Sequence, residues 1–174
     1  MNLIDMGKRA KAAGGLLGRA PTDVKNAALL AIADALEANA EAILSANTLD
    51  LTAARATGMS EAMLDRLNLH NRIGEIAADV RSVARLPDPV GAIIEARTMP
   101  NGLQVSKRRT TLGVIGVIYE SRPNVTVDVV SLCLKSGNAV ILRGGSETFR
   151  SNLALVRVIR AALEPFSQHI PADA

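Results

Sequence analysis

Residues 112–163, LGVIGVIYESRPNVTVDVVSLCLKSGNAVILRGGSETFRSNLALVRVIRAAL, decide the fold because they contain the same pattern twice. Two apolar strands, Leu112–Tyr119 and Ala139–Leu142, each run into a polar loop and then into a helical segment. Neither strand alternates polar with apolar residues, which is typical of parallel strands covered on both faces by helices. Crossovers between such strands are right-handed, so both loops should emerge at the same carboxyl edge, where open α/β sheets bind ligands. We therefore expect a site at loops 120–124 and 143–147.

The preceding residues predict a helical scaffold. Thr22 is the expected N-cap of one helix, and a single apolar stripe continues from Leu29 to Leu44. Ser60 is expected to cap a short helix through Leu67. A further apolar stripe is stopped by Pro87-Asp88-Pro89, because proline has no amide with which to continue a helix.

Residues 91–111 change to an alternating pattern on either side of Pro100-Asn101-Gly102. An Asn-Gly pair between two alternating runs predicts a β-hairpin, since both central residues can take positive φ. A two-stranded ribbon alone is barely stable in water. We expect it to lie against a partner subunit, with packing on its own domain as the alternative.

The composition favours one domain of helices packed on a sheet. The chain has 174 residues, of which 48% are hydrophobic and only 2% aromatic, and Cys133 is its one cysteine. No apolar run reaches the roughly 18 residues of a membrane span, and no secretory signal is seen, so a cytoplasmic location is the expectation. The net charge is +3, and its positive excess falls after residue 90, which favours an anionic ligand.

The two loops contain the candidate site residues. In the second loop, two glycines allow close approach of the backbone, the next helix offers free amides, and Arg143 suits phosphate. The pattern is neither GxGxxG nor a P-loop, so an ordinary strand–helix turn is the alternative. In the first loop, Asn124 could be an N-cap or an amide donor to an oxyanion.

Other chemistry is disfavoured by the sequence. Cys133 lies within an apolar helical stretch, where a thiol keeps a high pKa, so we do not expect it to be a nucleophile. No metal-ligand spacing is present. Nucleic-acid binding through Lys107-Arg108-Arg109 is also disfavoured, because the small net charge comes without an aromatic platform for bases.

The block at residues 113–148, GVIGVIYESRPNVTVDVVSLCLKSGNAVILRGGSET, closely resembles the γ-glutamyl phosphate reductase (glutamate-5-semialdehyde dehydrogenase) family of the aldehyde dehydrogenase superfamily. The resemblance extends through residues 60–67 and 84–91 and covers the chain as the N-terminal portion of a longer protein. It implies that residues 1–90 are the helical part of a Rossmann-type dinucleotide-binding domain and residues 112–174 its βαβα part. Residues 91–111 would be the oligomerisation hairpin, and the catalytic domain would be absent.

The resemblance implies NADPH-dependent reduction of L-glutamyl 5-phosphate to L-glutamate 5-semialdehyde and phosphate, in proline biosynthesis. Members attack the acyl phosphate with a cysteine of the catalytic domain, so Cys133 is not its counterpart and this chain is expected to be inactive alone. The implied partners are a small-molecule substrate, further copies of the chain, and a functional link to glutamate 5-kinase, with no nucleic acid or membrane. The alternative is a non-catalytic nucleotide-binding or assembly module.

The same resemblance assigns roles to individual residues. Asn124 would support the oxyanion, and Arg122 is the candidate for substrate binding. Arg143 takes the place of a lysine that contacts the adenosine ribose. Ser146 stands where many NAD-specific relatives carry a glutamate, which fits NADP, although a shift of one residue would put Glu147 there. The expected cofactor-binding residues are thus Arg143, Gly144, Gly145, Ser146, Glu147 and Ser121.

Overall fold

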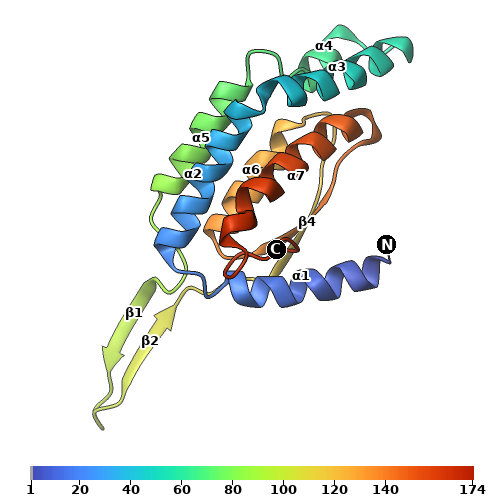
Figure 1. Ribbon diagram of the computed structural model, residues 1–174. Coiled ribbons are helices and arrows are strands. Elements are labelled where there is room, and N and C mark those ends of the chain that lie inside the picture. The colour runs from blue at the N-terminus through green and yellow to red at the C-terminus, as the bar shows by residue number, and fades with distance from the viewer. Residues whose placement is uncertain (1) are drawn as a thin grey trace.

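The computed structural model describes residues 2–174. A long helical layer packs over a small parallel sheet, and a hairpin projects from one end (Figure 1). In chain order the elements are α1 (Leu3–Leu17), α2 (Thr22–Ala38), α3 (Ala40–Ala56), α4 (Glu61–Leu67), α5 (Ile73–Arg85), β1 (Ile93–Thr98), β2 (Gln104–Arg108), β3 (Val114–Ile118), α6 (Asn124–Lys135), β4 (Ala139–Arg143) and α7 (Phe149–Leu163), with 3₁₀ turns at Ser146–Thr148 and Glu164–Phe166.

The predicted strand–helix–strand unit is present, and the α/β fold class is confirmed. β3 and β4 pair in parallel, with Val114 opposite Ala139 and Ile118 opposite Arg143. The pairing continues past the strands, because the Tyr119 amide donates to the Arg143 carbonyl at 3.1 Å. Both following loops therefore leave at the same carboxyl edge, as the two apolar strands predict.

The sheet is less covered than expected. Helix α6 packs against β4, and α1 packs against both strands, where a Cβ on Gly14 would lie 3.0 Å from the Gly113 carbonyl oxygen. Ile118, at the carboxyl end of β3, is nevertheless 84% exposed. The expectation that both faces of each strand are covered is therefore wrong within residues 2–174, because no described helix lies over this end of β3.

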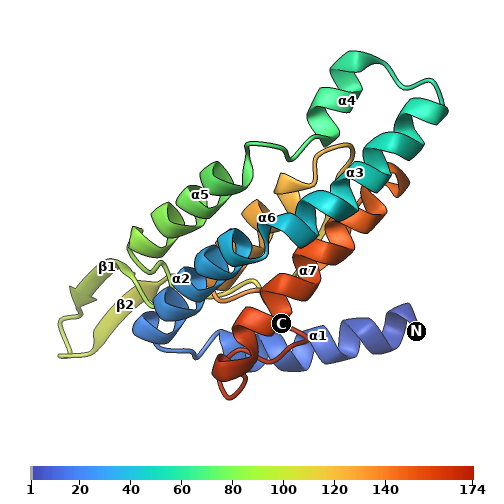
Figure 2. The ribbon, with the colours of Figure 1, turned by 45° about the horizontal axis from the view of Figure 1, so that its top comes forward.

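The core lies between the helices that cover the sheet. Helix α2 packs along α5 and also contacts α6 and α7, as Figure 2 shows from a second direction. The central side chains have no exposed surface, among them Leu29, Ile32, Leu36 and Val127. Each such aliphatic side chain contributes about 1.5–3 kcal/mol when fully buried, so this core supports the position of α6 and its N-terminal residues.

The apolar stripe of residues 29–44 belongs to two helices and not to one. α2 ends at Ala38, and Asn39 has φ −108° and ψ 18° before α3 begins. The Asn39 side chain donates to the Ala35 carbonyl at 2.8 Å, an alternative to helical bonding that asparagine makes readily. The stripe remains apolar on both sides of this break because Ile43 joins the same core.

Of the two expected helix caps, Ser60 is at its predicted position and Thr22 is not. Thr22 is the first residue of α2 and not its N-cap, and its hydroxyl donates to Asp88 Oδ2 at 2.7 Å. Ser60 does occupy the N-cap position of α4, but its side chain makes no capping hydrogen bond. Thr22 therefore serves a contact across the fold in place of a local one.

The predicted hairpin is confirmed, with a longer turn than expected. β1 and β2 pair antiparallel, and the Met99 amide donates to the Leu103 carbonyl at 2.8 Å. Gly102 has φ +84°, but Asn101 does not have positive φ, so the two central residues do not share that conformation. All residues of both strands are exposed, which rules out the alternative that the ribbon packs on its own domain.

A buried ionic cluster holds the root of this hairpin. Lys25 and Lys135 are only 1% and 3% exposed, and the Lys25 ammonium pairs with the Asp88 carboxylate. Lys25 also donates to the Lys135 carbonyl at 3.3 Å, and Lys135 donates to the Ala84 carbonyl at 2.9 Å. Although burial opposes it, hydrogen bonds from Lys25 and Thr22 hold the pKa of Asp88 below its usual value. The cluster thus joins α2, α5 and α6 to the segment that leads into β1.

No helix among the described residues is long and apolar enough to cross a membrane.

Candidate functional site

The two predicted loops contact each other directly. The Ser121 amide and hydroxyl donate to Glu147 Oε1 at 2.8 and 3.2 Å. Ser121 has φ +54°, an uncommon conformation for a residue other than glycine, and this turns its amide toward the carboxylate. A single carboxylate therefore joins the loop after β3 to the loop after β4.

Both loops are supported by a series of hydrogen-bonded polar side chains on the adjoining elements. The Tyr119 hydroxyl lies 2.5 Å from Thr126 Oγ1, which donates to Asn152 Oδ1 at 3.0 Å. Asn152 Nδ2 then donates to Thr148 Oγ1 at 2.9 Å. Burial raises the pKa of Tyr119 despite its bond to Thr126. The sequence reasoning did not find Thr126, Thr148 and Asn152. The available signal was a polar residue on the apolar face of each helix, Thr126 on α6 and Asn152 on α7, whereas Thr148 lies in the 3₁₀ turn before α7 and gave no such signal.

A hollow of about 590 Å³ opens where the two loops meet. It is lined by the end of β3, both loops and two methionines near α4, namely Met59, Met63, Ile118, Tyr119, Glu120, Ser121, Arg143, Gly144, Gly145, Ser146 and Glu147. We call this the loop hollow. It brings together all six residues predicted to bind a cofactor.

The two glycines of the loop hollow leave room for polar side chains of the chain itself. A Cβ on Gly144 would collide with Asn152 Nδ2, and a Cβ on Gly145 would collide with the Glu147 carboxylate. Arg143 is exposed, and its guanidinium donates to the Gly144 carbonyl. The glycines thus let the loop fold closely over Asn152 and Glu147, a reason that was not anticipated from the sequence.

Glu147 is held as an anion between the loops. Its own amide and the Ser121 donors lower the pKa of its carboxyl, and burial opposes them only in part. The neighbouring Ser146 is exposed at the same hollow. The carboxylate at position 147 is therefore already bonded within the chain, whereas the hydroxyl at position 146 is accessible.

Asn124 and Arg122 line a second, separate hollow. It measures about 300 Å³ and lies between α4–α5 and the start of α6, lined by Asp65, Arg66, Arg72, Glu75, Ile76, Asp79, Arg122 and Asn124. We call this the α5–α6 hollow. The candidate residues thus share one edge of the sheet but divide between two hollows, joined by the loop 119–123.

The capping interpretation of Asn124 is wrong. Asn124 is the first residue of α6, and Pro123 occupies the cap position. The Asn124 side chain donates through Nδ2 to Asp128 Oδ2 at 3.1 Å and does not accept a backbone amide. Its amide group is therefore oriented by a carboxylate one helical turn away, with the second N–H unpaired among the described residues.

The prediction that Cys133 is not a nucleophile agrees with its surroundings. The thiol is 6% exposed within α6, and burial raises its pKa. A thiol with a raised pKa holds little thiolate at neutral pH, and the thiolate is the reactive form. Within residues 2–174, no group of three or more His, Cys, Asp or Glu side chains could hold a metal ion.

Comparisons with solved structures first establish the fold class of this chain. The NAD-dependent benzaldehyde dehydrogenase of Corynebacterium glutamicum superposes with a TM-score of 0.69 over 92% of this chain and 34% of that chain, at 22% sequence identity. At that identity the likeness concerns the fold alone, and it is the aldehyde dehydrogenase fold. No family model matches the chain.

Closer relatives name one enzyme of this class. The γ-glutamyl phosphate reductase of Aliivibrio fischeri is 59% identical over 165 residues, covering 94% of this chain and 40% of the relative. The crystal structure of the γ-glutamyl phosphate reductase of Thermotoga maritima matches with a TM-score of 0.95 and 41% identity, over 99% of this chain and 42% of that chain. The chain is thus a homologue of γ-glutamyl phosphate reductases, as its sequence indicates, and spans about two fifths of their length.

Proposed function

We propose that this chain is the cofactor-binding part of an NADPH-dependent enzyme that reduces L-glutamyl 5-phosphate to L-glutamate 5-semialdehyde and phosphate in proline biosynthesis. The main support is the parallel pairing of β3 and β4, which brings the loops of Ser121 and Arg143 to one edge. The homologues carry the name of this reaction. In this proposal residues 1–90 and 112–174 form the dinucleotide-binding part, and residues 91–111 the oligomerisation hairpin.

The loop hollow fits a dinucleotide in its donors and charge. Arg143 offers a fixed positive charge, and Gly144, Gly145, Ser146 and Ser121 would hold the adenosine half through backbone and hydroxyl groups. The Glu147 carboxylate accepts from Ser121 within the chain, and the accessible group beside it is the Ser146 hydroxyl, so Glu147 is not free to bind both ribose hydroxyls as a ribose-binding glutamate does in NAD-specific relatives. This supports NADPH over NADH. When bound, the nicotinamide supplies the hydride for the reduction.

Asn124 would contribute an oxyanion donor. Its Nδ2 is oriented by Asp128, and the unpaired N–H of the amide remains for an oxygen that gains charge during the reaction. Because such a donor acts mainly on the transition state, it should affect turnover more than binding. The Asp128 carboxylate would hold the amide in the orientation that this role needs.

For Asn124→Ala, in the full-length reductase that we propose for this segment, we expect kcat to fall by about 10²–10³-fold, the usual effect of removing one oxyanion donor. The KM for the acyl phosphate should change much less. Steady-state kinetics together with thermal unfolding check this. A fall in melting temperature with unchanged kcat would show that Asn124 has only a structural role.

The reaction also needs a thiolate, and Cys133 does not supply one. We therefore expect the 174-residue chain alone to form no NADPH from NADP⁺, phosphate and L-glutamate 5-semialdehyde, whereas the full-length reductase does so. The absorbance of NADPH at saturating substrate measures both. Turnover by the isolated chain would contradict the assignment of catalysis to residues outside it.

The alternative, a non-catalytic nucleotide-binding or assembly module, makes a different prediction about the native protein. The mass of the protein isolated from cells decides between them, since a module would have the mass of this chain and a reductase a much larger one. The exposed apolar side chains of the hairpin, among them Ile93, Ile94 and Leu103, support assembly with further copies in either case. An unstable acyl phosphate substrate also favours a functional link to glutamate 5-kinase.

A further inference from the structure

The α5–α6 hollow carries charges of both signs that have no partner. Asp65 and Arg72 pair with each other at 3.0 Å, and Arg72 also donates to the Asp65 carbonyl. The remaining charged groups that line the hollow, Arg66, Glu75, Asp79 and Arg122, make no ion pair with any residue between 2 and 174. A hollow that offers unpaired cations and unpaired anions suits a ligand that is itself a zwitterion.

The negative charge in this region comes from Asp79 on α5 and Asp128 on α6. Burial, and then the charge of Asp79 on α5, raise the pKa of Asp128 on α6. The Asp128 carboxylate accepts from Asn124, but no described lysine or arginine pairs with either aspartate. Asp79 lines the hollow, and the negative charge of Asp128 acts with it, so this part of the hollow attracts a cation.

The positive charge comes from Arg122, which lies in the loop just before Asn124. Arg122 is exposed and precedes Pro123, which begins the turn into α6. Its guanidinium presents a planar pair of donors that matches both oxygens of a carboxylate. Arg122 and Asp79 therefore offer complementary charges within one hollow that also contains the Asn124 amide.

Building on the function proposed above, we propose that the α5–α6 hollow binds the amino-acid head of the substrate, with Arg122 on its α-carboxylate and Asp79 on its α-ammonium. In a glutamyl substrate only two methylene groups separate the α-carbon from the reacting carbonyl. The head must therefore lie within the length of one side chain from the oxyanion donor, and Asn124, Arg122 and Asp79 line the same hollow. Asp79 is then a specificity-determining residue.

The test compares three aldehydes in the full-length reductase, run in the direction that reduces NADP⁺ in the presence of phosphate. L-glutamate 5-semialdehyde has both head groups, glutarate semialdehyde lacks the ammonium, and 4-aminobutanal lacks the carboxylate. Because the amino-aldehydes cyclise reversibly, each variant is compared with the unmodified enzyme on the same aldehyde. The exposed Asp23 on α2 provides a matched control, Asp23→Asn.

We expect Asp79→Asn to lower kcat/KM at least about fivefold for the two aldehydes that carry an ammonium, and to leave glutarate semialdehyde within about twofold. Arg122→Gln should show the converse: kcat/KM should fall for the two aldehydes that carry a carboxylate and change little for 4-aminobutanal. Asp23→Asn should behave as the unmodified enzyme with all three aldehydes. Retained activity on the truncated aldehyde shows that each variant is folded.

The assignment would be overturned if Asp79→Asn lowered kcat/KM equally for all three aldehydes or for none of them. Inhibition by L-glutamate and by glutarate gives an independent readout, since Asp79→Asn should weaken only the first. If the unmodified enzyme does not oxidise L-glutamate 5-semialdehyde, the proposed function itself fails. If it does so and the variants show no selectivity, only the present inference fails.

Discussion

Asp88→Ala is expected to lower the free energy of unfolding by about 3–5 kcal/mol, because it leaves buried lysines without their anion. Lys25 is 1% exposed and pairs with Asp88, and Lys135 lies close enough for the same charge to act on it. Removing the carboxylate also removes the acceptor of the Thr22 hydroxyl at 2.7 Å. Urea unfolding of the 174-residue chain, followed by circular dichroism, measures the change.

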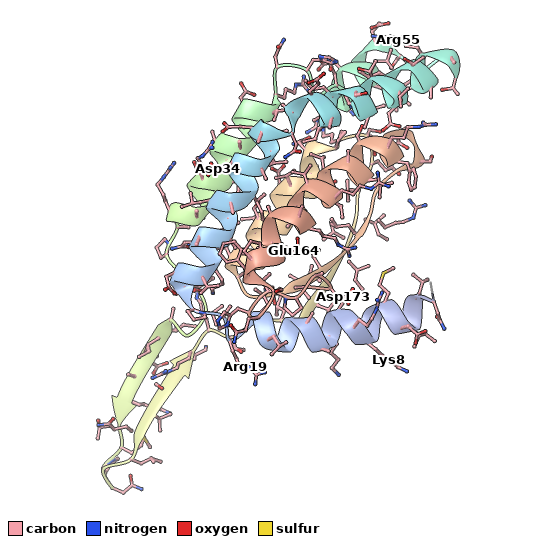
Figure 3. All side chains as sticks on the ribbon, viewed as in Figure 1. Lys8, Arg19, Asp34, Arg55, Glu164 and Asp173 are labelled. Atoms are coloured by element: carbon pink, nitrogen blue, oxygen red, sulfur yellow. The ribbon has the colours of Figure 1, made fainter. Side chains whose placement is uncertain are left out.

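A matched control is Asp34→Ala on the outer face of α2, where Figure 3 shows the labelled side chain. Asp34 pairs with Arg81 at 2.7 Å, but its side chain is 72% exposed, so the loss should be below about 1 kcal/mol. Equal effects of the two substitutions would contradict the role assigned to the buried cluster.

The buried pair of Lys25 and Asp88 also predicts that stability depends on pH. The pKa of Asp88 is lower in the folded chain than its usual 3.8, so its contribution to stability is fully present above that value. As the pH falls from 3.8 toward the lower folded pKa, the contribution is lost. The difference in stability between the unmodified chain and Asp88→Ala should therefore narrow in acid and stay constant near neutrality.

Arg143→Ala, in the full-length reductase, should weaken NADPH binding by about 1.5–3 kcal/mol, the usual range for a hydrogen bond to a charged group. Arg143 is exposed beside the loop hollow, and its own contact is with the Gly144 carbonyl, so its loss removes charge without opening the core. The dissociation constant should rise roughly 10- to 150-fold, measured by fluorescence titration with NADPH.

Arg19→Ala is the control for this substitution. Arg19 lies beside the root of the hairpin, as its label in Figure 3 shows. It is not among the residues that line the loop hollow. Its removal should leave NADPH affinity unchanged. An unchanged affinity for Arg143→Ala as well would remove Arg143 from the cofactor site.

The sequence predicts the features that depend on local pattern. The two apolar strands, their parallel pairing and the hairpin around Gly102 follow from periodicity and turn chemistry, because both act over a few residues. The contact between the two loops also follows, since parallel strands that are joined by one crossover must end side by side.

The features that escaped prediction depend on residues distant in the sequence. Lys25 meets Lys135 across 110 positions, and Asp88 draws the Thr22 hydroxyl away from its local cap. Asn39 breaks an apolar stripe that stays continuous in sequence, because the core lies on both sides of the break. Asparagine is common at N-cap positions, which predicts a cap at Asn124, but a carboxylate one turn further along α6 accepts from its side-chain amide instead.

A crystal structure of the full-length reductase with NADPH bound tests the central claim most directly. The account predicts that the adenosine half lies in the loop hollow, with its ribose and 2′-phosphate beside Arg143 and Ser146 and the Glu147 carboxylate still bonded to Ser121. A cofactor bound away from the carboxyl ends of β3 and β4 would contradict it.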